Sequence, residues 1–188
     1  MSNLAKPSQV VAAGRLSYAS IWEPRPAEKP GDKAMYQCML IIRKDDTKTV
    51  QALNGVIKPL IETAKAANNG VLPSTFKYGL RDGDTDRPAD PNLKGCLFLN
   101  CSSKYPPAIV DRNPQHRITE QHRVYSGCNV RLDLNVYLRT NAANPGIGFG
   151  LNSVQFVSDG EPLGGGRSAE AAFGEALEDQ SDSPSWMD

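Results

Sequence analysis

The chain has 188 residues, of which 39% are hydrophobic and 22% are charged. That length and balance are typical of one soluble globular domain with a substantial core, with or without a tail. No apolar run approaches the roughly 20 residues that cross a bilayer, and residues 1–12 lack the apolar block of a signal peptide. We therefore expect no membrane association and a protein that works in a cytoplasm.

Charge is divided unevenly along the chain, although the formal net charge is zero. Residues 1–158 carry 20 Lys+Arg and 13 Asp+Glu, a net charge of +7, whereas residues 159–188 carry one arginine and eight acids, a net charge of −7. A basic body with an acidic tail occurs in proteins that bind polyanions, because the tail can compete for the basic surface. A solvated, disordered end is the alternative interpretation.

The first third of the chain predicts two strands joined by a loop. Residues 14–22 alternate as a strand does, with Leu16 and Tyr18 on the same face. Three prolines and a glycine in residues 23–33 predict an irregular loop. The apolar run at residues 34–43 predicts a central strand covered on both sides.

One long helix follows. Asp45, Asp46 and Thr47 supply capping chemistry for its start, and residues 68–70 (Asn-Asn-Gly) are a stop signal. We expect Pro59 to kink or divide the helix. Apolar residues recur between these ends at helical spacing, namely Val50, Leu53, Ile57, Leu60, Ile61 and Ala64.

The middle of the chain is irregular. Residues 79–95 predict a charged loop, residues 96–101 a short strand and residues 108–111 another. Residues 113–123 are polar and basic and predict a mobile excursion. The four cysteines lie in apolar segments and are expected to be small buried hydrophobes, namely Cys38, Cys96, Cys101 and Cys128.

The clearest strand spans Ser126–Thr140. Apolar residues occupy every second position from Val130 to Leu138, and polar residues fall between them. In the last strand, residues 147–157, the phase changes at Asn152-Ser153, which predicts a β-bulge. We predict a mainly β fold, an OB-type five-stranded barrel with one main helix and long loops. It would comprise a flexible arm (1–12), a domain (13–160) and a disordered acidic tail (161–188).

Two metal sites deserve consideration, and neither has the required geometry. The spacing Cys96-x4-Cys101-x14-His116-x5-His122 falls within loose zinc limits. However, the two cysteines are five positions apart on a strand and point to opposite faces. We therefore predict no metal, and metal analysis of the purified protein tests this expectation.

Asp82, Asp84 and Asp86 begin like a calcium loop, but Arg87 and Leu93 replace the required glycine and glutamate. The same carboxylates could hold magnesium in a nuclease, which stays open as one alternative. The sequence contains neither a Gly-x-Ser-x-Gly elbow nor a phosphate-binding Gly-Lys-Ser/Thr loop. We predict that the protein is not an enzyme and uses no cofactor.

Aromatic residues next to basic ones suggest binding of single-stranded nucleic acid. Aromatic faces stack on unpaired bases while Lys and Arg follow the backbone, although any single tyrosine could instead be half-buried core. Six clusters fit this pattern, namely Arg15/Tyr18, Lys33/Tyr36, Lys77/Tyr78/Arg81, Lys104/Tyr105, Arg123/Tyr125 and Tyr137/Arg139.

The polar face of the Ser126–Thr140 strand gives the most specific proposal. Its side chains would form one wall of a DNA groove, and the first strand would supply the facing side. The proposed wall consists of Arg131, Asn135, Tyr137 and Arg139, and the facing residues are Arg15 and Tyr18. Asp133 is the one acid among them and is expected to pair with a neighbouring arginine.

Several ordered motifs resemble a phage-encoded family of single-stranded DNA-binding proteins with an OB fold, formerly a domain of unknown function. The resemblance covers most of residues 12–170. The chain is also similar in plan to the single-stranded DNA-binding proteins of short-tailed coliphages. It rests on Gly14–Tyr18, Leu80–Asp84, Ile109–Asp111, Tyr125–Cys128, Gly150–Gln155 and Asp159–Gly165.

The resemblance implies a protein that coats exposed strands in phage DNA replication and recombination, in the cytoplasm of the infected bacterium. Its tail would modulate DNA access and recruit replication proteins, through Glu175, Glu178, Asp179, Asp182, Trp186 and Asp188. A protein–protein module or virion assembly factor is the alternative. Weaker binding to double-stranded DNA and formation of a homodimer stay open.

Overall fold

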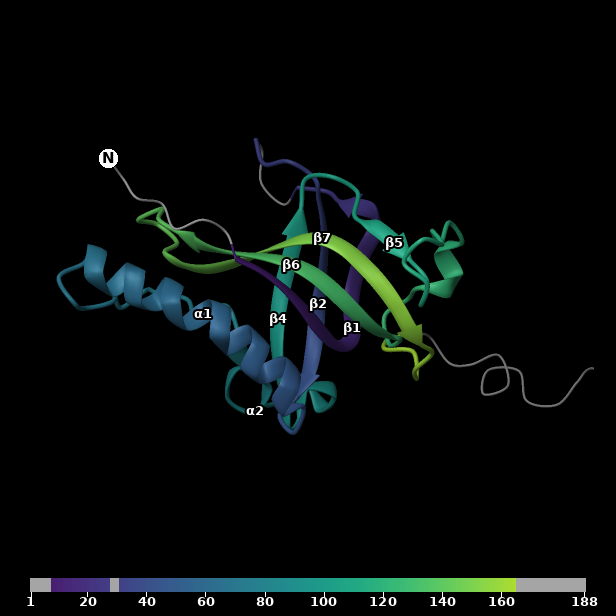
Figure 1. Cartoon of the computed structure of the whole chain (residues 1–188), viewed down its shortest axis with the longest axis horizontal. Coiled ribbons are helices and arrows are strands. Elements are labelled where there is room, and N and C mark those ends of the chain that lie inside the picture. The colour runs from purple at the N-terminus through teal and green to yellow at the C-terminus, as the bar shows by residue number, and fades with distance from the viewer. Residues whose placement is uncertain (1–7, 28–30, 165–188) are drawn as a thin grey trace, which may run out of the picture.

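The computed structural model describes residues 8–27 and 31–164, which form a closed barrel flanked by a long helix (Figure 1). The barrel strands are β1 (Ser8–Arg25), β2 (Met35–Arg43), β4 (Cys96–Ser103), β6 (Asn129–Arg139) and β7 (Gly146–Ser158). Two short strands, β3 (Arg81–Asp82) and β5 (Ala108–Val110), extend the sheet at its ends. The helical elements are α1 (Thr47–Ala67), α2 (Gly83–Asp86) and two 3₁₀ turns, η1 (Pro91–Leu93) and η2 (Gln121–Arg123).

Pairing closes the five strands into a ring. β1 is antiparallel to both β2 and β6, β2 is antiparallel to β4, and β6 is antiparallel to β7. A parallel contact between Ser102 of β4 and Gly150 of β7 completes the circle. The predicted mainly β, OB-type five-stranded barrel is therefore confirmed.

Strand β1 is longer than predicted and serves two neighbours. It pairs with β6 from Ser8 to Arg15 and with β2 from Arg15 to Arg25. Gly14 lies at this crossover, where an added Cβ would sit 2.4 Å from the Ile41 carbonyl oxygen. The predicted arm was too long, because residues 8–12 are part of β1 and their backbone is paired with β6.

The alternation in β6 and the bulge in β7 are both confirmed. Val130, Leu132, Leu134 and Val136 are each at most 1% exposed, while the residues between them face outward. Opposite them, the register of β7 slips by one residue at Asn152, since Asp133 faces Ser153 but Leu134 faces Leu151. Bulges of this kind bend a sheet and help it to close.

Helix α1 packs its apolar face on the barrel, against β1, β6 and β7. Asp46 caps its start by accepting a hydrogen bond from the Thr49 amide, and Gly70, with φ of 84°, ends it by donating to the Lys65 carbonyl. Pro59 lies inside the helix and does not divide it, contrary to one of the two predicted outcomes. Among the described residues, no helix is long and apolar enough to span a membrane.

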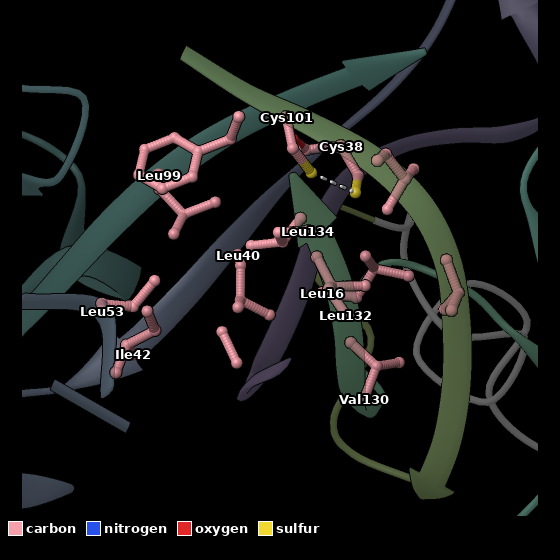
Figure 2. Close-up of a cluster of buried hydrophobic side chains, with 14 of the residues drawn as sticks. Leu16, Cys38, Leu40, Ile42, Leu53, Leu99, Cys101, Val130, Leu132 and Leu134 are labelled. Atoms are coloured by element: carbon pink, nitrogen blue, oxygen red, sulfur yellow. Dashed lines mark hydrogen bonds between the residues drawn. The ribbon is translucent and has the colours of Figure 1, made fainter. Parts of the chain in front are cut away.

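One core fills the barrel and extends beneath α1 (Figure 2). Within it, Cys38 of β2 and Cys101 of β4 are register partners, with their sulfur atoms 3.3 Å apart. The hydrogen bond to Cys101, together with burial, raises the pKa of the Cys38 thiol well above its usual value. Cys128 is also buried, whereas Cys96 is only half-buried, so the prediction of four buried cysteines was wrong for Cys96.

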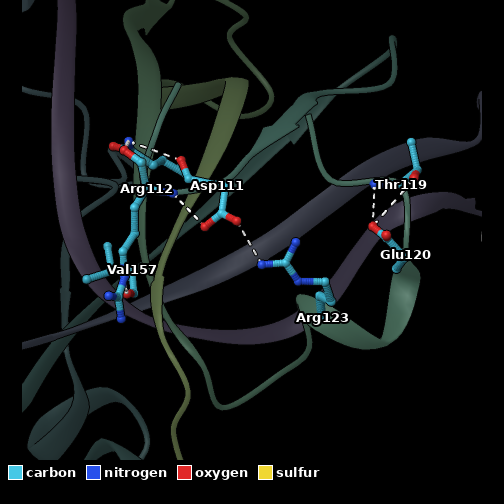
Figure 3. A network of polar contacts seen from close by, with 7 residues as sticks. Asp111, Arg112, Thr119, Glu120, Arg123 and Val157 are labelled. Carbon is cyan, nitrogen blue, oxygen red and sulfur yellow. Dashed lines mark hydrogen bonds and ion pairs between the residues drawn. The ribbon is translucent and has the colours of Figure 1, made fainter. Parts of the chain in front are cut away.

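Residues 113–123, after β5, were predicted to be mobile, but the structure anchors them to the barrel. Ile118 and Val124 are buried in the core, and the Ile118 amide donates to the Ile109 carbonyl at 2.9 Å. Arg123 forms an ion pair with Asp111 at 2.8 Å (Figure 3). The two buried side chains, the backbone hydrogen bond and the ion pair together hold the segment against β5.

Candidate nucleic-acid interface

A groove of about 1010 Å³ runs across β2 and β4 and past the adjoining ends of β6 and β7. Its floor includes polar side chains of the two central strands, Gln37, Asn100 and Ser102. Residues 76–82, which include β3, and residues at the end of α2 form another part of its lining. Six of the residues predicted to bind nucleic acid line this groove, namely Tyr18, Lys77, Tyr78, Arg81, Tyr137 and Arg139.

Three of these residues are tyrosines with exposed rings. Tyr18, Tyr78 and Tyr137 are 62%, 55% and 37% exposed. Tyr78 is supported by an edge-to-face contact with Phe76, whose ring centroid lies 5.5 Å away. Since unpaired bases stack on exposed aromatic faces, the groove offers three platforms from separate elements.

The backbone of β1 explains how Tyr18 reaches the groove. Leu16 and Tyr18 were predicted to share a face, but Leu16 is fully buried and Tyr18 is exposed. Tyr18 has φ of 46°, and the pairing of β1 with β2 shifts register between Ser17 and Ser20. This bulge turns the tyrosine outward and then returns Ile21 to the core.

Tyr137 lies across the backbone of β7. Gly148 is its register partner, and a Cβ on that glycine would sit 2.5 Å from the Tyr137 ring. The absence of a side chain at position 148 therefore lets the ring lie low over the sheet. One ring face is covered by the neighbouring strand, which restricts the orientation of the side chain.

The groove is basic. Five cationic side chains line it, two of which, Arg25 and Arg87, were missed by the sequence analysis, and only the carboxylates of Asp82 and Asp86 oppose them. Among the described residues, neither the Lys77 ammonium nor the Arg139 guanidinium has an ion-pair partner. The Nε atom of Arg139 is also buried, and no described residue accepts a hydrogen bond from it. Charge not neutralised internally favours binding of an anion.

Asp82 and Asp84, considered above as metal ligands, instead bind an ammonium. Lys44 Nζ lies 2.8 Å from Asp82 and 2.7 Å from Asp84, and these contacts lower the pKa of both carboxyl groups. Asp84 also accepts the Gly95 amide at 3.0 Å. The described residues contain no cluster of three potential metal-ligating side chains. The geometry gives these carboxylates a structural role.

Two residues of the proposed wall, Arg131 and Asn135, lie outside the groove lining and bond to their own sheet. Arg131 donates to Gln155 at 3.1 Å, and Asn135 donates to Asn152 at 2.7 Å. Asn152 in turn donates to Asp133, so the expected pairing of Asp133 with an arginine was wrong. Only Tyr137 and Arg139 of the four wall residues lie at the groove.

The remaining predicted residues are dispersed around the barrel. Arg15 donates to the carbonyls of Gly127 and Glu161, and Tyr125 donates to the Gly160 carbonyl at 2.9 Å. These bonds attach the segment after β7 to the barrel. The others outside the groove lining are Tyr36, Lys104, Tyr105 and Arg123.

A second hollow of about 1090 Å³ adjoins the groove. The two share Tyr18, Arg25 and Arg87, among other residues. Leu163 and Gly164, the last described residues, line this hollow, and the Leu163 amide donates to the Ser126 carbonyl at 2.8 Å. The six predicted tail residues, Glu175, Glu178, Asp179, Asp182, Trp186 and Asp188, lie outside the described residues.

Comparison with known proteins identifies the family. A solved structure of the single-stranded DNA-binding protein from bacteriophage Enc34 in complex with ssDNA is similar, with 22% identity and a TM-score of 0.67, over 87% of this chain and 100% of that one. Bacteriophage T7 gp2.5, a single-stranded DNA-binding protein, is 14% identical with a TM-score of 0.64, over 82% of this chain and 93% of that one.

A curated relative is the putative protein p50 of Acyrthosiphon pisum secondary endosymbiont phage 1. It is 28% identical over 158 residues, which are 81% of this chain and 84% of the relative. The family model described as "Enterobacter phage Enc34, ssDNA-binding protein" matches residues 8–183. The chain therefore belongs to this family of phage single-stranded DNA-binding proteins, as the sequence resemblance predicted.

Proposed function

We propose that this protein binds single-stranded DNA along the groove over β2 and β4. The observation that carries the proposal is the meeting in one groove of three exposed tyrosines with Lys77 and Arg139, which have no ion-pair partner among the described residues. OB folds bind oligonucleotides on the face of their second and third strands, and β2 and β4 hold these positions here. Membership of the family supports the same function.

The chemistry of the groove favours binding without strong sequence preference. Tyrosine rings stack on any base, and lysine and arginine contact phosphates common to all sequences. Such a protein coats exposed strands without catalysing a reaction. We infer a role in replication and recombination of phage DNA, in the cytoplasm of the infected bacterium.

The acidic C-terminal segment is proposed to regulate access to the groove. Residues 165–188 contain six acids and one arginine, and the described chain ends in a hollow that shares Tyr18, Arg25 and Arg87 with the groove. A polyanionic segment attached there would compete with DNA phosphates at a high effective concentration. When DNA displaces it, the segment would become available to replication proteins.

Titration of a labelled oligo-dT strand tests the function. We expect saturable binding whose log affinity falls with log salt by about 0.7 for each phosphate contacted. Removal of residues 167–188 should raise the affinity, and a duplex of the same length should bind more weakly. If the protein does not bind the strand at low salt, with or without its tail, the proposal is overturned and a protein–protein module becomes the better explanation.

A further inference from the structure

Two arginines lie against one buried aromatic ring at the edge of the groove. The Cζ atoms of Arg81 and Arg87 are 5.0 Å and 5.5 Å from the centroid of the Phe98 ring, and Phe98 is fully buried. Both arginines line the groove. We infer that Arg81, Arg87 and Phe98 form a phosphate clamp, in which the ring orients two guanidinium groups toward one backbone phosphate of the bound strand.

The ring is well placed to act as a support. Phe98 belongs to a small apolar cluster with Met39, Ile41 and Leu93, which is separate from the main core of the barrel. Arg81 is its direct register partner on β3. A guanidinium group is attracted to the face of an aromatic ring, and its planar shape allows stacking that a lysine ammonium cannot reproduce. The cluster therefore fixes the position of the ring beneath the arginines.

The loop that carries the two arginines is held in place from several sides. Asp82 and Asp84 lie between the two arginines in sequence, and Lys44 forms ion pairs with both of these carboxylates. The amide of Arg87 donates to the Gly83 carbonyl at 3.1 Å. Gly83 lies so close to η1 that an added Cβ would be 2.2 Å from the Leu93 carbonyl oxygen. The arginines are thus positioned before any ligand arrives, which reduces the entropic cost of binding.

The two guanidinium groups of this cluster differ in their acidic partners. Asp86 accepts a hydrogen bond from Arg81 Nε at 3.2 Å, and no acidic partner of Arg87 occurs among the described residues. Two cations therefore share one ring, and only one of them is bonded to a carboxylate. A phosphate has several acceptor oxygens, forms forked hydrogen bonds with guanidinium groups and would relieve the repulsion between them. A DNA phosphate is the occupant that the surrounding groove favours, so this inference rests on the proposed function.

A double-mutant cycle on the full-length protein tests the clamp, with oligo-dT as the probe. The cycle combines Arg87→Ala with Phe98→Leu, a change that keeps an apolar side chain but removes the aromatic face. We expect Arg87→Ala to lower the affinity several-fold in the wild-type background and to have little effect beside Phe98→Leu. Arg87→Lys should not restore full affinity, because it retains the charge but loses the fork.

Arg131→Ala is the matched control, since Arg131 is exposed but bonded to Gln155 outside the groove. It should leave the affinity unchanged in both backgrounds, and thermal unfolding shows whether each variant is folded. If Phe98→Leu does not fold, a cycle between Arg81→Ala and Arg87→Ala replaces it, with less than multiplicative loss expected for a shared phosphate.

Three outcomes separate this inference from the proposed function. Coupled losses support the clamp. The clamp alone is overturned if the losses are independent and multiplicative. It is also overturned if the wild-type protein binds DNA and the Arg87→Ala variant binds it equally well. If the wild-type protein does not bind the strand, the proposed function fails and the clamp fails with it.

Discussion

Two outer faces of the same barrel carry similar residues in different states. On the β6–β7 face, Arg131 is bonded to Gln155, and Asn135 is linked through Asn152 to Asp133. The groove over β2 and β4, by contrast, presents three exposed tyrosines together with Lys77 and Arg139, which have no ion-pair partner among the described residues.

The difference shows that residue type alone does not define a binding surface. A side chain that has satisfied its hydrogen bonds within the sheet must break them before it can bind a ligand, which reduces the net gain. A preformed but unneutralised cation has no such cost. Partnering within the fold therefore distinguishes a structural polar face from a proposed DNA-binding face, and four comparisons of variants test the two faces and the elements around them.

The largest effect is expected inside the barrel that both faces share. Leu132 is fully buried, so Leu132→Ala should lower the free energy of unfolding by about 2–5 kcal/mol. The neighbouring Arg131→Ala, on the outer face of the same strand, should change it by only about 0.5 kcal/mol or less. Urea denaturation of both variants measures the difference. Equal losses would contradict the assignment of the inner and outer faces.

The next effect concerns two exposed tyrosines. Tyr137→Ala should weaken binding of oligo-dT by about 1–3 kcal/mol, roughly 5- to 150-fold, because one stacking platform is lost. Tyr105 is 78% exposed but lies outside the groove lining, so Tyr105→Ala is the matched control and should bind normally. Fluorescence anisotropy titration compares them. Equal weakening would mean that the strand does not follow this groove.

A smaller difference should separate two arginines of β6. Arg139→Ala removes a groove cation and should reduce the slope of log affinity against log salt by about 0.7. Arg131→Ala, which removes a cation bonded to Gln155, should leave the slope unchanged. Titrations at several salt concentrations measure both slopes. A reduced slope for Arg131→Ala alone would reverse the roles of the two faces.

The smallest effect concerns pH and the loop beside the groove. Lys44 lowers the pKa of Asp82 and Asp84, so their contribution to stability is present above the ordinary carboxyl pKa of about 4 and is lost as pH falls through the lowered values. Wild-type protein should therefore have a higher Tm than Lys44→Met at neutral pH. The difference should shrink in acid below about pH 4. A constant difference down to the lowest pH would argue against these ion pairs.

Periodic segments were predictable from sequence because a single physical rule determines them. The β6 alternation follows from burial of one strand face, and the phase change at Asn152 identified the β7 bulge. Helix α1 was predicted from its apolar spacing and its cap at Asp46. Pro59 did not divide the helix, because packing of the surrounding apolar face against the barrel outweighs one missing hydrogen bond.

Positions that depend on tertiary contacts were not predictable in the same way. Tyr18 reaches the groove through a bulge with positive φ, although residues 17–20 (Ser-Tyr-Ala-Ser) contain no glycine or asparagine to indicate one. Arg15 and Arg87 are equally basic in sequence, yet Arg15 bonds to the Gly127 carbonyl while Arg87 lies over Phe98. Only the paired strands and the folded loop distinguish these two roles.

The path of the DNA strand is tested most directly by photocrosslinking. A bromodeoxyuridine oligonucleotide is irradiated with the full-length protein, and the crosslinked residues are identified by mass spectrometry. The proposed groove predicts crosslinks at Tyr18, Tyr78 or Tyr137, all suppressed by unlabelled oligo-dT. The proposed groove would be contradicted if the crosslinks that unlabelled oligo-dT suppresses were confined to Tyr105, Tyr125 or other residues outside the groove.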